Sequence, residues 1–232
     1  MLRKSTNSGR RSAVITGVLL IAGLVTGIFS VVPVIDGADY LVKASINENQ
    51  VQIGVIFQLL MVVTYVVVPI VLYPILSKHN KGLALGSVAF GIIAGVFIII
   101  GVIILLLLLT LSHEFAKVGT LNGSYFQSLG GLLREGRDLV NHVATTLAFV
   151  VAMFLINRIF YQTKLVPRWL SVSGILGSAL SILASLLFMI RFIGLDATYM
   201  MLNIPIAFQQ LVLAIWLIIK GFNRADALEK KV

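Results

Sequence analysis

The sequence has no cysteine and few charged residues, and these two absences limit what the protein can be. Without cysteine there is no disulfide, no thiolate nucleophile and no cysteine-ligated metal. Charged residues make up 12% of the 232 residues, against about 25% in a typical soluble domain. The apolar residues, at 59%, gather into six long runs. Since a bilayer core of roughly 30 Å requires about 20 apolar residues from each crossing helix, the composition predicts a polytopic membrane protein.

The expected fold is all-α, with a single integral membrane domain over residues 1–232 and six transmembrane helices. We expect the spans near residues 13–35, 51–76, 83–111, 139–156, 169–193 and 199–219. A transmembrane barrel is excluded, because its strands would alternate apolar and polar residues. The third run exceeds the thickness of the hydrocarbon, so its helix has to tilt or project beyond the bilayer.

The 18 lysines and arginines are unevenly distributed between the runs. They concentrate in both terminal segments and in the loops after the second and fourth runs, whereas most of the nine acidic residues lie in the other loops. The positive-inside rule therefore predicts a bacterial plasma (inner) membrane protein with both termini in the cytoplasm. We interpret the net charge of +9 as an orientation signal that also meets anionic lipid headgroups on the cytoplasmic face. Nucleic acid is not an expected partner.

The loop over residues 112–138 is the longest on the expected outer side, between the third and fourth helices. Tyr125, Phe126, Leu129 and Leu132 recur there at helical spacing. This pattern predicts a short amphipathic helix that lies at the outer interface and leads into the fourth span.

Glycines recur at spacings of four residues in the first and third runs. They are Gly23 and Gly27, and then Gly82, Gly86, Gly91 and Gly95. Such small-xxx-small pairs let another helix approach closely. They favour packing within the chain, and they leave open a face for a homo-oligomer or for another membrane partner.

Several short segments are distinctive when taken together. They are LVPRWLS (165–171), NIPIAFQQ (203–210), AIWLIIKGFN (214–223), NENQ (47–50) and SYFQ (124–127). These segments resemble a family of bacterial membrane proteins catalogued as domain of unknown function 4386, and the resemblance covers nearly the whole chain. It implies a six-helix integral membrane fold and no established activity, substrate or cofactor.

Polar residues inside the spans need a partner or a purpose, because hydrocarbon cannot satisfy them. The candidates for a shared polar pocket in the outer half of the bundle are Gln58, Tyr65, His142, Thr146, Asn203 and Gln210. Interhelical hydrogen bonding, at about 0.6 kcal/mol per bond, is the alternative role for these groups. Both interpretations stay open on the sequence.

A second candidate cluster at the outer rim consists of Glu135, Asp138 and His142, at spacings of three and four that share one helical face. Two carboxylates and an imidazole are groups that bind a divalent metal or relay a proton. Arg134 and Arg137 are interleaved with them and favour a solvated, ion-paired rim instead. We therefore expect no bound metal and no cofactor.

Three functions remain open on these residues. The leading hypothesis is a non-enzymatic membrane component that acts as a partner, sensor or envelope-stress factor, because no catalytic signature stands out. The first alternative is a transporter or channel for a small solute or for protons, lined by the polar pocket. The second is an intramembrane enzyme that uses the cluster of Glu135, Asp138 and His142.

Overall fold

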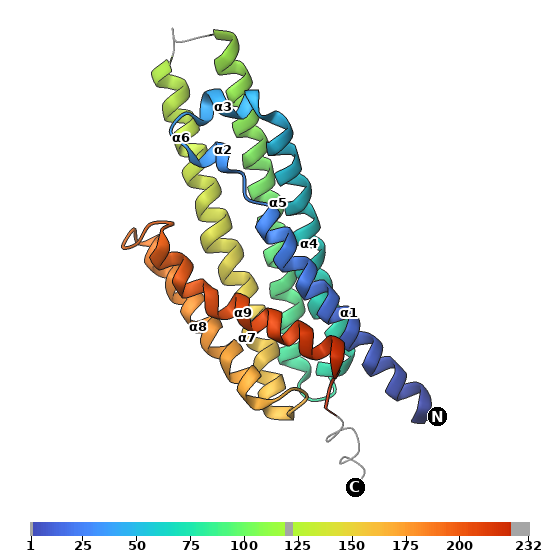
Figure 1. Ribbon diagram of the computed structural model, residues 1–232. Coiled ribbons are helices and arrows are strands. Elements are labelled where there is room, and N and C mark those ends of the chain that lie inside the picture. Colours follow the sequence, from blue (N-terminus) through green and yellow to red (C-terminus); the bar gives the residue numbers. More distant parts are fainter. Residues whose placement is uncertain (1, 119–122, 224–232) are drawn as a thin grey trace.

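Helices account for all the secondary structure in the part of the chain that the computed structural model describes, residues 2–118 and 123–223. They are α1 (Leu2–Phe29), α2 (Pro33–Asp36), α3 (Tyr40–Ile46), α4 (Glu48–Leu76), α5 (Lys81–Val118), α6 (Gly123–Leu139), the π-helical segment η2 (Val140–Thr145), α7 (Thr146–Thr163), α8 (Arg168–Met189) and α9 (Ala197–Ile219). The segments α6, η2 and α7 follow one another without a break and form one long helical rod (Figure 1).

Six helical stretches are long and apolar enough to cross a membrane. They cover Gly9–Phe29, Glu48–Leu76, Lys81–Val118, Gly123–Thr163, Arg168–Met189 and Ala197–Ile219. The expectation of an all-α fold with six membrane helices is therefore confirmed for the described residues, and the chain is a multi-pass membrane protein.

The helix bounds differ from the expected spans at several ends, among them the end of the fourth stretch at Thr163 instead of residue 156 and the end of the fifth at Met189 instead of residue 193. The first helix ends at Phe29 instead of continuing to residue 35, because Pro33 disfavours helical geometry in the residue before it. The third helix runs on to Val118. The fourth begins at Gly123 rather than near residue 139, because α6, η2 and α7 follow one another as one helical stretch. The polar residues of α6 lower the local hydropathy and hide this continuity in the sequence.

The start of α1 and the end of α9 lie side by side at one end of the bundle (Figure 1). The Arg10 guanidinium joins them by donating to the carbonyls of Ile218, at 2.7 Å, and Ile219, at 3.2 Å. We call this the terminal end. The opposite end, where α5 stops and α6 starts, is the far end. Residues 224–232, which hold part of the basic C-terminal segment, lie outside the described residues.

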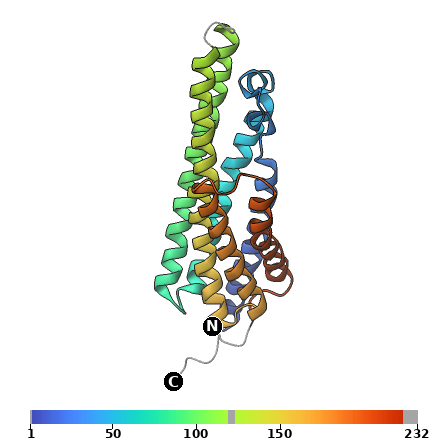
Figure 2. The ribbon, with the colours of Figure 1, turned by 90° about the vertical axis from the view of Figure 1, so that its left-hand side faces the viewer.

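Buried apolar side chains form two separate cores. The terminal-end core includes Leu72, Leu76, Ile156, Phe160, Leu170, Leu213 and Leu217. The far-end core includes Val32, Ile35, Tyr40, Leu41, Ala44, Val51, Leu105, Leu108, Leu109 and Phe126. Helix α5 takes part in both, and with α6 it extends well past the ends of α8 and α9 (Figure 2). The far end is thus packed around apolar residues of its own.

The closely spaced glycines lie against groups of the same chain. Gly23 faces Thr64, Gly27 faces Met61, Gly82 faces Asn80, Gly86 faces Leu155, Gly91 faces Pro69 and Gly95 faces Val66. At Gly91 an added Cβ would come within 2.7 Å of the Pro69 ring and 2.8 Å of the Tyr65 carbonyl oxygen. These glycines therefore bring α1 close to α4, and α5 close to α4 and α7.

Candidate functional site

The π-helical segment η2 offers a backbone carbonyl to two neighbouring helices. A π-helix pairs residues five apart instead of four, which changes the direction and pairing of its carbonyls. The carbonyl of His142 accepts a hydrogen bond from the Ser185 hydroxyl of α8, at 2.8 Å, and from the Tyr199 hydroxyl of α9, at 3.1 Å. One carbonyl therefore joins η2, α8 and α9.

The imidazole of His142 lies among aromatic rings. It packs edge-to-face against Phe188, with 6.2 Å between ring centroids, and against Tyr199, with 5.3 Å. The two hydroxyls that bond to His142 do so at its carbonyl, not at its ring. In this arrangement the ring contributes packing and activates neither hydroxyl.

Two other expected pocket residues lie around Tyr199. The side chains of Thr146 and Asn203 are close enough to its hydroxyl to interact with it. Both also bond to the backbone of their own helical stretch, Thr146 to the Asn141 carbonyl at 3.2 Å and Asn203 to the Tyr199 carbonyl at 2.9 Å. The sequence carries no signal for Tyr199 as the centre of this group, because an aromatic residue at the start of a span is typical of an interface anchor.

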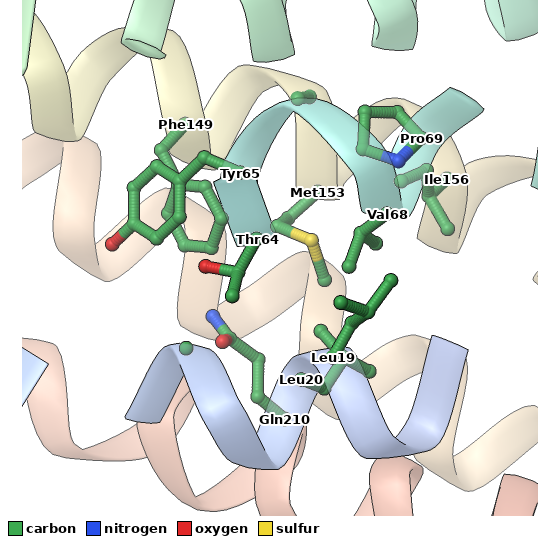
Figure 3. A pocket seen from close by; sticks show the side chains of 12 residues that line it. Leu19, Leu20, Thr64, Tyr65, Val68, Pro69, Phe149, Met153, Ile156 and Gln210 are labelled. Carbon is green, nitrogen blue, oxygen red and sulfur yellow. The ribbon is translucent and has the colours of Figure 1, made fainter. Parts of the chain in front are cut away.

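Tyr65 and Gln210 line a small cavity among α1, α4, α7 and α9 (Figure 3). Its volume is about 20 Å³, which is room for about one water molecule. The Gln210 amide points toward Thr64 (Figure 3), and no hydrogen bond joins it to another side chain or carbonyl within the described ranges. The Tyr65 ring is stacked on Phe149, with 4.0 Å between centroids. The cavity is otherwise lined mainly by apolar side chains.

Gln58 lines neither the Tyr199 group nor this cavity. Its amide nitrogen donates to the Ser30 carbonyl at 3.2 Å, just after the end of α1. Carbonyls at the end of a helix have no partner within it, so Gln58 satisfies one of them and fastens α1 to α4.

The buried pair Asn157 and Gln209 was not among the expected site residues. The Gln209 amide nitrogen donates to the Asn157 side-chain oxygen at 3.2 Å and to the Leu170 carbonyl at 3.3 Å. Asn157 is 0% exposed and Gln209 2%, and Gly174 makes room for them, since a Cβ there would lie 2.4 Å from Asn157. An amide side chain within an apolar span can be recognised in the sequence. Which two amides meet, however, depends on how α7 and α9 pack.

The three residues of the expected rim cluster have different neighbours. Glu135 pairs with Arg191, Asp138 lies 3.5 Å from the Arg137 guanidinium, and His142 contacts the aromatic rings described above. The helical spacing of three and four therefore does not gather the three groups around one point, because each side chain has different partners. Across residues 2–118 and 123–223, no group of three or more His, Asp and Glu side chains is arranged to hold a metal ion.

Two arginines of α6 fasten the segment that joins α2 to α3. The Arg137 guanidinium is buried and lies 3.1 Å from the Asp36 carboxylate. Arg134 donates to the Gly37 carbonyl at 3.1 Å and covers the ring of Tyr40, 5.6 Å from its centroid. Burial raises the pKa of the Tyr40 hydroxyl, and the nearby Arg134 guanidinium offsets part of this rise.

An open groove lies between α6 and the end of α8, with a volume of about 660 Å³. Arg134, Glu135 and Asp138 line one wall, and Phe188 and Arg191 belong to the other. The Glu135–Arg191 ion pair crosses from one wall to the other.

The family described as Domain of unknown function (DUF4386) matches residues 15–221, from α1 through the end of α9. The chain belongs to the DUF4386 family. This match confirms the resemblance carried by the short segments. No curated protein and no solved structure matches the chain.

In this DUF4386 protein, three of the six polar side chains expected to form a pocket, Gln58, Thr146 and Asn203, bond to backbone carbonyls instead. Gln58, Ser185, Tyr199 and Gln209 each join two different helices. Interhelical bonds of this kind stabilise a bundle in lipid. The groove and the water-sized cavity are two places in the described part of the DUF4386 chain that offer space to another molecule.

Proposed function

We propose that the chain is a non-enzymatic component of the bacterial plasma membrane that presents a rigid helical platform to a partner protein outside the cytoplasm. The platform consists of α2, α3, α6 and the parts of α4 and α5 packed against them. The observation that carries the proposal is the length of α5. Its 38 residues span about 57 Å at 1.5 Å per residue, against a hydrocarbon core of roughly 30 Å.

The charged residues beside the groove support the separation of the chain into a part within the bilayer and a platform outside it. Arg134, Glu135, Asp138 and Arg191 lie at one level of the far half. A charged side chain at the centre of a bilayer costs about 2.5–3.5 kcal/mol on insertion scales, so this level marks where the hydrocarbon ends. The part of α6 from Gly123 to Arg134 then stands beyond the bilayer.

The platform is held together by its own contacts. In addition to the far-end core, the Ser112 hydroxyl of α5 donates to the Leu41 carbonyl at 2.6 Å and accepts from the Ser45 amide at 2.9 Å. Two bonds from one buried hydroxyl therefore tie α3 to α5. A platform fixed in this way can present a binding surface without first having to order itself.

Apolar side chains on the platform are exposed where no lipid covers them. Ile46 is 74% exposed and shares a face of α3 with Val42, while Leu132 is 68% exposed and lies two turns from Tyr125 on α6. Exposed apolar patches outside a membrane are typical of protein interaction sites, and aromatic residues are enriched at their centres. The partner is accordingly a protein with an apolar contact surface.

The absence of cysteine gives a direct test of orientation. We expect Ser128→Cys, on the exposed side of α6, to react with a membrane-impermeant maleimide in spheroplasts. His79→Cys, in the exposed loop between α4 and α5, should react only after the membrane is permeabilised, because positive-inside bias places the terminal end in the cytoplasm. The measurement is gel-shift labelling of the two variants. Labelling of His79→Cys in sealed spheroplasts would reverse the orientation.

The proposed partner can be captured by a photoreactive benzoylphenylalanine placed at Leu132 or Tyr125. We expect a discrete protein adduct at both positions and none at Leu176, which is 59% exposed but lies on α8 within its span. A charge in an apolar contact should weaken binding strongly, so Leu132→Glu should lower recovery of the partner about tenfold or more. If adducts form equally at Leu176, or recovery is unchanged by Leu132→Glu, the platform is not the binding surface.

A further inference from the structure

We propose that the groove between α6 and the end of α8 binds a zwitterionic phospholipid whose headgroup carries a phosphate and a primary ammonium. This inference uses different residues from the partner surface, and it rests on the bilayer level that the proposed function assigns to the groove. It starts from the shape of the groove. A volume of about 660 Å³ is within the range of sites that hold a small molecule, and here it accommodates a headgroup with the first part of its acyl chains.

The charges in the groove are balanced. Arg134 and Arg191 are the two cations that line it, and Glu135 and Asp138 are the two anions. Guanidinium groups bind phosphate oxygens through paired hydrogen bonds, while carboxylates accept hydrogen bonds from an ammonium. An anionic headgroup would meet two carboxylates with no cation of its own. A zwitterionic headgroup with a primary ammonium can pair its phosphate with the arginines and its ammonium with the carboxylates.

Two of the four charged groups, Glu135 and Arg191, are exposed to a ligand. In the Glu135–Arg191 pair, the Arg191 side chain is 80% exposed and the Glu135 side chain 52%, so a headgroup can insert between them without opening the protein core. Arg191 also holds a left-handed backbone conformation, with φ of 59°, just after the end of α8. The left-handed backbone conformation favours glycine. The chain nevertheless has an arginine at this position, and its charge lies at the groove.

The apolar part of the groove faces the bilayer. Phe188, Leu139 and Ile193 contribute to its walls, and Met189 and Phe192 beside them are exposed. Charged groups at one level and apolar groups next to them match an amphiphile at a membrane interface. The groove lies where α8 leaves the bilayer, so the ligand can enter laterally from the lipid.

Native mass spectrometry of the full chain, released from nanodiscs of equal phosphatidylethanolamine, phosphatidylglycerol and phosphatidylcholine, tests the proposal. We expect phosphatidylethanolamine to be retained about tenfold over each of the other two, equivalent to about 1.4 kcal/mol. Glu135→Gln and Arg191→Gly should both remove this preference. Arg191→Gly also relieves the left-handed backbone, so thermal stability should be unchanged or higher, which separates loss of binding from loss of fold.

The matched control is Arg158→Gln, an exposed arginine of α7 near the terminal end, which should keep the wild-type preference. Equal retention of the three lipids would overturn the proposal, as would a preference for phosphatidylglycerol. Preference for phosphatidylethanolamine that persists in both groove variants would place the lipid elsewhere on the protein and would overturn it too.

Discussion

Replacing Gly91 by leucine is expected to lower the free energy of unfolding by about 3 kcal/mol or more, because overpacking a close helix contact forces the backbones apart. Even a Cβ at this position would lie 2.7 Å from the Pro69 ring and 2.8 Å from the Tyr65 carbonyl oxygen. Neither group can swing aside, since one is a closed ring and the other belongs to the helix backbone. Helices α4 and α5 form the most extensive helix pair within the described residues, so the effect should reach the whole bundle.

The measurement is unfolding of the purified protein in detergent, followed by the fluorescence of its two tryptophans. Gly131→Leu is the matched control, because nothing lies within 4 Å of a Cβ at that exposed glycine of α6. It should not lower stability and should raise it by up to about 1 kcal/mol, because glycine inside a helix is less favourable than leucine. Equal stability of the two variants would show that α4 and α5 do not depend on the Gly91 contact.

Replacing Arg137 by methionine should destabilise the far end by about 2 kcal/mol. Breaking a buried ion pair by removing one partner costs about 3–5 kcal/mol. Here the Arg137 side chain is 8% exposed but the Asp36 side chain is 52% exposed, so water compensates part of the loss. The substitution keeps most of the side-chain volume and removes the charge that holds α2 against α6.

A double-mutant cycle with Asp36→Asn isolates the pair. We expect the two substitutions together to cost less than their sum by about 1–2 kcal/mol, the range typical of directly contacting groups. Lys117→Met, which breaks the exposed pair with Glu114 near the end of α5, is the control and should change stability little. Strict additivity at Arg137 and Asp36 would mean that the two side chains stabilise the fold independently.

The six spans could be predicted from the sequence because the requirement of the bilayer is local. A helix in hydrocarbon satisfies its own backbone, so about 20 consecutive apolar residues are sufficient to identify it. The lengths of α5 and of the α6–η2–α7 rod could not be predicted in the same way. At the far end, apolar residues such as Phe126 are buried by packing against another segment, and a hydropathy average cannot separate them from residues that face lipid.

The candidate site shows the same difference between what the sequence indicates and what helix packing determines. The sequence indicates which side chains are polar within apolar helices, and Gln58, His142 and Gln210 were all visible for that reason. The residues that contact these side chains could not be predicted from the sequence. Gln58 meets the end of α1, the His142 carbonyl meets α8 and α9, and Gln210 faces a cavity beside Thr64. Each arrangement depends on the rotation of one helix against another, which no single helix specifies.

The sequence by itself determined the class of protein, the family and the number of membrane helices, since composition, motifs and apolar run length are properties of the chain alone. It also carried the charge asymmetry from which the orientation is inferred. Only the tertiary structure decided that a π-helical segment at Val140–Thr145 presents the His142 carbonyl to two helices, and that Glu135 faces Arg191 across a groove. Those contacts join residues more than 40 positions apart, and they exist only once close packing has set the helices in place.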